Sequence, residues 1–168
     1  MNATFPPPLL QLADYDGDVS AYLNALYAVF LEDFVTKPPV AFHPKRFAMK
    51  RYPMERGKEA TFWHLISSGH CEEERLPDLR RCERIRWPRA VIDAYGTGRV
   101  HSWKKRSGGD LRIVIALTDF SYVVILKEAP EYVLLWTAYC VESEHRRAKI
   151  KREFLDLGTP LKMRVPPP

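Results

Sequence analysis

The sequence predicts an α+β fold in which N-terminal helices pack on a mainly antiparallel four- to five-stranded sheet, with a C-terminal helix. Three observations lead to this prediction: an amphipathic helical repeat early in the chain, four closely spaced β-rich segments in the last third, and a charged helical segment after them. The chain has 168 residues, of which 46% are hydrophobic. That length suits one hydrophobic core, so we expect a single domain over 1–168.

The N-terminal region is expected to be a loose leader followed by an acidic helix. Three consecutive prolines within 1–17 cannot join a helix or a central strand. In the acidic segment 18–43, aromatic and leucine side chains repeat every three or four residues over 20–35, which predicts a deeply packed helix. Asp18 or Ser20 is expected to cap it.

The α+β core is expected over 57–157, after a basic loop or short extended arm at 44–58. A strand is predicted at 61–67, "TFWHLIS", and a helix is predicted from Pro88, since proline suits the first helical turn. Four further strands are expected at 99–104, 111–118, 121–128 and 131–141. Short turns separate them, so consecutive antiparallel pairing is the natural topology. A helix capped by Ser143 should fill 143–157, and a tail is expected at 158–168.

Charge is distributed unevenly along the chain. Residues 1–43 contain one Lys and five acidic residues, a net charge of −4, so the rest of the chain must carry +9 to reach the total of +5. An acidic N-terminal part and a basic remainder make a polyanion a plausible partner. A merely basic protein is the plain alternative.

Strand alternation places polar groups among apolar neighbours on three of the expected strands. They are His64 on the first, Arg112 on a middle strand, and Thr137 with Tyr139 on the last, where both are expected to share a face with Val133. If these faces coincide, the sheet has one polar floor with a base, a cation and two hydroxyls. Each residue also has an ordinary structural interpretation, such as a hydrogen-bonded core histidine or a solvated edge arginine.

A floor of this composition is suited to cleaving RNA without a metal ion. The 2′-hydroxyl is the nucleophile, so the protein must supply proton transfer and stabilise charge on phosphorus. Histidine transfers protons near neutral pH, and arginine grips phosphate through two parallel hydrogen bonds. We therefore take His64, Arg112, Thr137 and Tyr139 as candidate catalytic residues.

Basic clusters at 45–58, 104–112 and 146–152 are candidates for contacts with the RNA backbone. Trp87, Trp103 or Tyr139 could stack on an unpaired base. Trp63 and Trp136 are instead expected in the core. The residues chosen as candidate RNA contacts are Lys58, Arg86, Trp103, Lys104, Arg106 and Arg146.

The segments "GKEATFWHLISSGH", "RRCERIRWPRAVID" and "HSWKKR…LRIVIAL…YVVILKE…YVLLWTAYCVE" resemble phage- and mobile-element-borne proteins of the barnase–EndoU–colicin–RelE superfamily, over roughly residues 57–155. The resemblance implies helices packed on a four-stranded antiparallel sheet and a metal-independent endoribonuclease, often a toxin. It also implies that His64, a cation such as Arg112, and the "TAY" residues Thr137 and Tyr139 form the site. The chain departs from the pattern by its additional C-terminal helix and by lacking an obvious second site histidine; His101 and His145 are weak candidates for the acid.

Two other classes of function compete with a ribonuclease acting on tRNA or mRNA. One is a non-catalytic nucleic-acid-binding protein that uses the same sheet. The other is an interaction or immunity-type protein whose acidic N-terminal helix masks its basic face. A ribonuclease of the toxin type implies an antitoxin or inhibitor protein as a further partner.

No cofactor or metal is expected. His70 and Cys71 with Cys82 fail as a zinc site because no second closely spaced pair of ligands follows. The three cysteines are scattered, which favours a reducing cytoplasm over a disulfide framework. No apolar run reaches the roughly 20 residues of a membrane helix, and the start has no secretory signal, so no membrane is expected as a partner.

Overall fold

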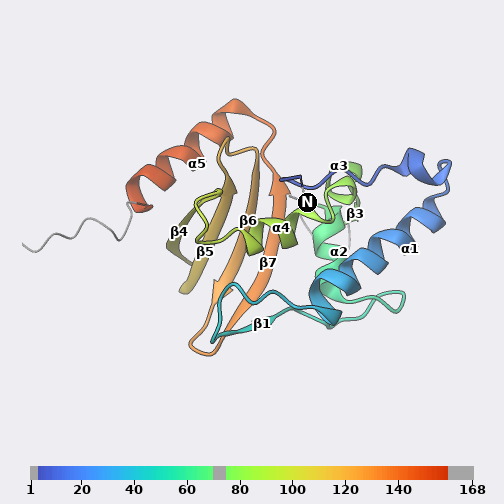
Figure 1. The fold of residues 1–168 in the computed structure, drawn as a ribbon, viewed down its shortest axis with the longest axis horizontal. Coiled ribbons are helices and arrows are strands. Elements are labelled where there is room, and N and C mark those ends of the chain that lie inside the picture. The colour runs from blue at the N-terminus through green and yellow to red at the C-terminus, as the bar shows by residue number, and fades with distance from the viewer. Residues whose placement is uncertain (1–3, 70–74, 159–168) are drawn as a thin grey trace, which may run out of the picture.

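The computed structural model describes residues 4–69 and 75–158, and it has the expected α+β architecture (Figure 1). A five-stranded mixed sheet has the order β1-β7-β6-β5-β4, with helices on both of its faces. Its strands are β1 (Arg46–Ala48), β4 (Val100–Ser107), β5 (Asp110–Leu117), β6 (Tyr122–Glu128) and β7 (Tyr132–Cys140). The expected tail lies outside the described residues, apart from its first residue.

The expected N-terminal helix is confirmed. Helix α1 (Val19–Phe30) continues into a π-helical segment, η2 (Leu31–Thr36), and buries the aromatic stripe that the sequence indicated. The carboxylate of Asp18 accepts a hydrogen bond from the Ala21 amide at 3.0 Å, so Asp18 is the N-cap. Phe30 and Phe34 are fully buried in the main core cluster, together with side chains of the sheet.

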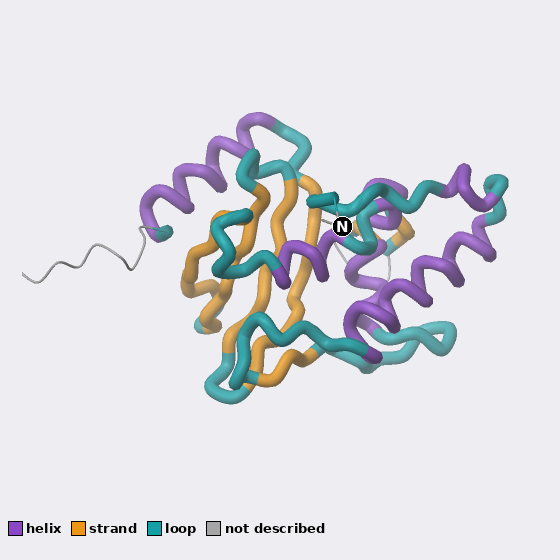
Figure 2. Tube along the Cα trace, viewed as in Figure 1, coloured by secondary structure: helices purple, strands orange, loops and turns teal. Residues whose placement is uncertain are grey.

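Residues 4–17 are held against the core and do not form the loose leader expected from their prolines. A 3₁₀ turn, η1 (Leu12–Tyr15), precedes α1. The Trp87 indole donates to the Pro7 carbonyl at 2.8 Å, and the Tyr22 hydroxyl donates to the Leu10 carbonyl at 2.7 Å. Figure 2 shows this segment as the loop that begins at N and reaches η1. Proline removes hydrogen-bond donors but leaves carbonyls. This segment uses both kinds of group, because the Leu10 amide also donates to the Glu83 carbonyl at 2.9 Å.

The strand predicted at 61–67 is wrong, because helix α2 (Ala60–Ile66) occupies this segment. Phe62, Leu65 and Ile66 are buried, and their spacing of three and four residues is helical. A short apolar run is compatible with the two-residue period of a strand and with the 3.6-residue period of a helix, and here the pattern of buried side chains is helical. Only Ser67–Ser68, as β2, are extended, and they pair with β3 (Leu76–Pro77).

The basic segment at 44–58, expected to be a loop or a short extended arm, contains one short strand. β1 pairs in parallel with the start of β7, and Arg46 lies opposite Tyr132. The Lys50 amide donates to the Thr61 hydroxyl at 2.8 Å, and this hydroxyl donates to the Lys50 carbonyl at 2.9 Å, so the middle of this segment is fixed to the start of α2. We call residues 44–58 the basic arm.

Two short helices, α3 (Leu79–Glu83) and α4 (Trp87–Asp93), follow β3. Pro88 lies in the first turn of α4, as predicted. Val91 and Ile92 are fully buried against the sheet. Helices α1 to α4 therefore contribute to one core cluster on one face of the sheet, which we call the inner face.

The four-strand meander is confirmed, since β4, β5, β6 and β7 pair consecutively and antiparallel. The turn after β4 is a two-residue hairpin in which Gly108 and Gly109 both have positive φ, 58° and 84°, a conformation that glycine adopts at little cost. Arg112, Val114 and Ala116 share one face, as expected. We call this second face the outer face.

A β-bulge at Trp136 overturns the expected alternation of β7. Ile125 pairs with Thr137, whereas the next residue of β6, Leu126, pairs with Leu135, so Trp136 has no partner opposite it. Val133 and Leu135 consequently face the inner core, while Thr137 and Tyr139 face outward. Trp136, expected in the core, is 49% exposed.

The C-terminal helix α5 (Glu144–Leu157) is confirmed, including its cap: the Ser143 hydroxyl accepts from the Arg146 amide at 3.2 Å. Ile150 and Phe154 pack on the outer face, and α5 lies diagonally across the upper part of the sheet in Figure 1. Leu157, expected on the same stripe, is exposed. No helix within the described residues is long and apolar enough to cross a membrane.

Candidate functional site

The structure brings three of the four candidate catalytic residues to the outer face. Arg112 comes from β5, and Thr137 and Tyr139 come from β7. In the register, Tyr139 lies level with Ala116 of β5, two strands across and four residues along from Arg112. Strand spacing of about 4.8 Å and a rise of about 3.3 Å per residue put their backbones about 16 Å apart. They face the same solvent region, but the Arg112 guanidinium is held by Asp110, which lies two residues further from the level of Tyr139 along β5.

His64 is not on this face. Its helix, α2, packs in the inner core cluster through Phe62, Leu65 and Ile66. The imidazole of His64 contacts the guanidinium of Arg75 instead. The expected convergence of His64 with Arg112 and Tyr139 is therefore wrong, because the segment is a helix on the inner side of the sheet and not one of its strands.

Arg112 is held in place although it carries charge in a buried position. It is only 8% exposed, and its Nη2 donates to the Asp110 carboxylate at 2.9 Å. Its guanidinium lies 4.0 Å from the centre of the Trp136 ring, a cation–π contact. Lys127 pairs with the same carboxylate at 2.8 Å. Hydrogen bonding to Lys127 lowers the pKa of Asp110, so this carboxylate stays charged between its two cations.

A groove with a volume of about 230 Å³ lies along the junction between α5 and the outer face. We call it the α5 groove. Glu153 on its α5 side accepts from the Trp103 indole at 2.8 Å and pairs with Lys105 at 2.8 Å, so these bonds tie helix to sheet. The groove is lined by Trp103, Lys105, Val114, Val123, Ile125, Tyr139, Arg146, Lys149, Ile150 and Glu153.

Tyr139 and Arg146 also line a second, larger cavity of about 380 Å³, which we call the arginine pocket. Burial raises the pKa of Tyr139 above its ordinary value of 10, while Arg146 acts in the opposite direction. The phenol therefore stays protonated near neutral pH and can donate a hydrogen bond. The pocket is lined by Ser68, Asp78, Arg80, Arg81, Tyr139, Cys140, Glu142, Ser143 and Arg146.

The His64 pocket is separate from both and has a volume of about 250 Å³. Trp63, which is half-buried, donates from its indole to the Glu55 carbonyl at 3.0 Å and so connects α2 to the basic arm. The pocket is lined by Pro53, Glu55, Arg56, Ala60, Trp63, His64, Ser67, Arg75, Leu76 and Pro77.

The six candidate RNA contacts are dispersed over the molecule. Only Trp103 and Arg146 line the α5 groove, and Trp103 is 4% exposed, so it cannot stack on a base. Lys104 pairs with the Glu128 carboxylate at 2.7 Å, and Lys45 of the basic arm contacts the same group at 2.6 Å. Arg106 is exposed near the end of the β4–β5 hairpin.

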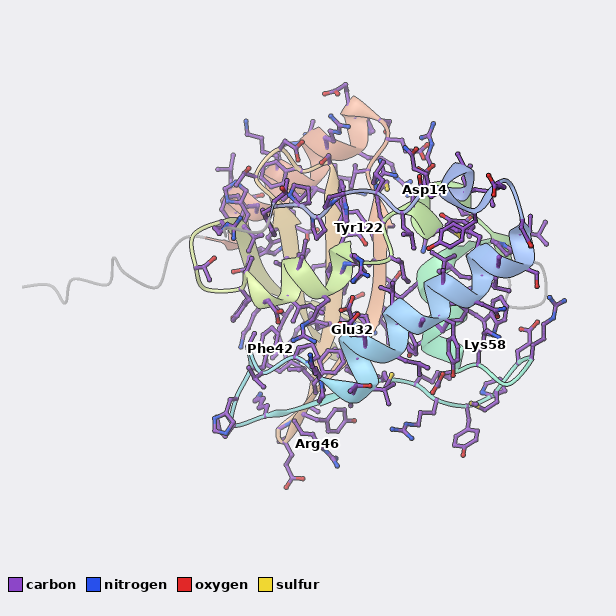
Figure 3. The ribbon with its side chains drawn as sticks, turned by 45° about the vertical axis from the view of Figure 1, so that its right-hand side comes forward. Asp14, Glu32, Phe42, Arg46, Lys58 and Tyr122 are labelled. Atoms are coloured by element: carbon purple, nitrogen blue, oxygen red, sulfur yellow. The ribbon has the colours of Figure 1, made fainter. Side chains whose placement is uncertain are left out.

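Lys58 and Arg86 belong to the α1 side of the molecule. The Lys58 ammonium lies 5.0 Å from the centre of the Tyr27 ring on α1, and Arg86 lies 3.8 Å from the Glu32 carboxylate on η2. Figure 3 shows Lys58 and Glu32 on this side, away from α5. Since α1 packs in the inner core cluster, it lies on the side of the sheet opposite the outer face.

Sequence reasoning missed Trp136 and the arginine pair of α3. Trp136 was expected in the core because nothing in "VLLWTAYCV" indicates a bulge. In the sequence, Arg80 and Arg81 lie near Glu72–Glu74 and Glu83, which favours local ion pairs. Arg80 does form an ion pair, but with Glu142 at 2.6 Å. That contact crosses from α3 to the end of β7, so only the tertiary structure shows it.

No group of three or more potential metal ligands is found within residues 4–69 and 75–158; His70 and Cys71 lie outside this part of the chain. Comparisons with protein-family models, with curated proteins and with solved structures found no match to this chain.

Proposed function

We propose that the protein binds single-stranded RNA on the outer face of its sheet, along the α5 groove. The observation that carries the proposal is the bulge at Trp136. It turns Thr137 and Tyr139 to the same face as Arg112 and leaves a tryptophan half-exposed beside them. Cations, hydroxyls and an exposed aromatic ring thus share one surface, the combination that single-stranded nucleic acids require.

The spacing of these groups suits an extended strand better than a small substrate. Arg112 and Tyr139 are about 16 Å apart by strand spacing and rise, so they would contact different nucleotides. Trp136 lies between them along β7, next to Thr137. A strand lying across β5, β6 and β7 would meet a cation, a stacking surface and a hydrogen-bond donor in turn.

Trp136 is the expected stacking surface. Arg112 lies over one side of its ring at 4.0 Å, which orients the indole while leaving about half of the residue exposed. Stacking on an aromatic side chain contributes about 1–3 kcal/mol per base and tolerates any sequence, because every base has a π-face. We therefore expect binding with weak sequence preference.

The charge of this surface is net positive. Its lysines and arginines outnumber its two carboxylates, those of Asp110 and Glu153. The cations are Lys105, Arg112, Lys127, Arg146 and Lys149. Contacts between these groups and phosphates would release counterions, so affinity should fall as salt rises. RNA as a partner agrees with the cytoplasmic location expected from the scattered cysteines.

The test is a fluorescence anisotropy titration of labelled oligouridylate in EDTA, with wild type and Trp136→Ala. Loss of one stacked base should weaken binding about 5- to 150-fold, which corresponds to about 1–3 kcal/mol. Tyr52→Ala is the matched control, since Tyr52 is 74% exposed but lies on the basic arm. Equal affinities of the two variants would refute binding on the outer face, and tighter binding of duplex RNA would refute the single-strand preference.

RNA cleavage without a metal is a second candidate function, and the contact between His64 and Arg75 favours it. This contact puts a proton-transfer group beside a cation suited to phosphate, inside a pocket that also contains Ser67 and Arg56. His64 would accept the 2′-hydroxyl proton as this oxygen attacks phosphorus, and Arg75 would stabilise the charge on the phosphate. The bond between phosphorus and the 5′-oxygen would then break, and the 5′-oxygen would take a proton from water. Arg112, Thr137 and Tyr139 would then hold RNA at a distance from the cleaved bond.

Cleavage is tested with purified protein and total RNA in the presence of EDTA. Fragments ending in 2′,3′-cyclic phosphate, produced by wild type and lost in His64→Ala, would support this second function. Fragments that persist in His64→Ala would reveal a contaminating nuclease. Oligouridylate binding without fragments would leave RNA binding as the function.

A further inference from the structure

We infer that the arginine pocket binds one phosphodiester group of the RNA strand, at the place where the strand leaves the α5 groove. This inference rests on the proposed RNA binding and adds a defined contact to it. The pocket has room for a phosphate and part of a ribose, with a volume of about 380 Å³. Its cations come from two separate elements, Arg80 and Arg81 from α3 and Arg146 from α5.

The pocket and the α5 groove are adjacent. Tyr139 and Arg146 line both cavities, so one phenol and one guanidinium stand at the boundary between them. A strand that follows the groove past Tyr139 therefore enters the pocket directly. Tyr139 stays protonated because burial raises its pKa, so its hydroxyl can donate to a phosphate oxygen at this boundary.

Arg81 is held in place before any ligand binds. Its Nη1 donates to the His64 carbonyl at 3.3 Å and to the Ala138 carbonyl at 3.1 Å, which fixes the guanidinium between α2 and β7. A pre-positioned arginine loses less conformational freedom on binding than a free one, which favours affinity. Arg146 is exposed and would supply the adjustable contact.

The net charge of the lining points to a phosphodiester rather than a terminal phosphate. Three arginines stand against the carboxylates of Asp78 and Glu142, a net charge of +1. Asp78 is occupied in capping α3, where it accepts from the Arg80 and Arg81 amides at 3.0 and 3.4 Å. One negative charge, that of a phosphodiester, balances this lining, whereas the dianion of a phosphate monoester exceeds it.

The Glu142 carboxylate occupies Arg80, one of the arginines expected to bind the phosphate. It pairs with Arg80 at 2.6 Å, and both side chains are largely exposed, so the pair contributes little stability by itself. A phosphate in the pocket would compete with Glu142 for Arg80. Removing the Glu142 charge should therefore tighten RNA binding, an effect opposite in sign to the removal of an arginine.

The experiment measures oligouridylate affinity at several salt concentrations for Arg146→Gln, Glu142→Gln and Arg152→Gln. Arg152 is an exposed arginine of α5 that lines neither cavity, so it controls for the overall charge of the helix. Arg146→Gln should weaken binding and reduce the slope of log K against log salt by about 0.7, the value for one phosphate contact in a single strand. Glu142→Gln should tighten binding, and Arg152→Gln should change neither affinity nor slope by a comparable amount.

Different results separate the two proposals. Equal effects of Arg146→Gln and Arg152→Gln, with Trp136→Ala still weakening binding, would overturn the phosphodiester site and leave RNA binding on the outer face intact. Unchanged affinity of Glu142→Gln would also overturn the site. A 5′-phosphate on the probe that tightens wild-type binding, and does so less in Arg146→Gln, would mean that the pocket takes a phosphate monoester. Absence of any wild-type binding would overturn both proposals.

Discussion

The packing of α5 on the outer face gives the sharpest prediction, because the side chain of Phe154 supplies most of the aromatic contacts between this helix and the sheet. Phe154 packs against His101, Trp103 and Phe120, with ring centres 4.3, 5.5 and 5.9 Å away. The perturbation is Phe154→Ala. It removes the largest apolar contact between α5 and the sheet and leaves the charged face of the helix unchanged.

The expected magnitude follows from burial. Truncating a fully buried Phe costs about 3–5 kcal/mol, and since Phe154 is half-buried we expect about half of this, near 2 kcal/mol. The higher helix propensity of Ala returns about 0.5 kcal/mol, so the net destabilisation is about 1.5 kcal/mol. For a domain of this size that lowers the melting temperature by about 3–6 °C.

The assay is thermal denaturation followed by circular dichroism, with Leu155→Ala as the matched control. Leu155 is the next residue of α5 and is 60% exposed, so its truncation should change the melting temperature by less than about 2 °C. Equal melting temperatures for the two variants would refute the packing of α5 on the outer face. The α5 groove requires this packing, because α5 supplies one of its two sides.

Three further predictions concern stability. Burial raises the pKa of Glu128, but hydrogen bonds from two lysines outweigh this effect and hold the pKa below its ordinary value of 4.5. The charged carboxylate therefore stabilises the folded state above pH 4.5, and this contribution is lost as the pH falls through the lowered pKa. Urea titrations should therefore find Glu128→Gln destabilised at pH 7 and converging with wild type as the pH falls through the lowered pKa of Glu128, unlike the exposed control Glu131→Gln. Burial raises the pKa of Asp33 from 3.8 to about 6, so its charge costs stability above pH 6; Asp33→Asn should be the more stable protein at pH 7, with an advantage that disappears below pH 4. Arg81→Ala removes two hydrogen bonds that join α2 to β7 and should cost about 2–4 kcal/mol in the same titrations, against less than about 0.5 kcal/mol for Arg80→Ala, whose ion pair is exposed; equal costs would contradict the bridging role.

Local signals were sufficient for strands β4 to β7 and for the caps of α1 and α5. The paired glycines 108 and 109 specify a two-residue hairpin, and the segments on either side of it have the composition of strands. Ser143 caps α5 as expected, because its hydroxyl accepts a hydrogen bond from the Arg146 amide, which has no carbonyl partner within the first turn of the helix. Such features depend on neighbours in the sequence, so the sequence alone reveals them.

The candidate site depended on two features that local signals do not determine. The run from Ala60 to Ile66 fits both a strand and a helix, and packing of three residues against the inner core selects the helix. The bulge at Trp136 arises from the pairing of β7 with β6, and one extra residue there turns Thr137 to the opposite face. His64 and Tyr139 were therefore expected together and lie apart.

Cross-linking tests the central claim most directly. Oligoribonucleotides carrying 4-thiouridine would be bound to the wild-type protein, irradiated, and the attached peptides located by mass spectrometry. RNA binding on the outer face requires cross-links within β7, around Trp136 and Tyr139, and in the first turns of α5. Cross-links confined to the basic arm and to α1, with none in β7, would place RNA on the other side of the molecule and contradict the account.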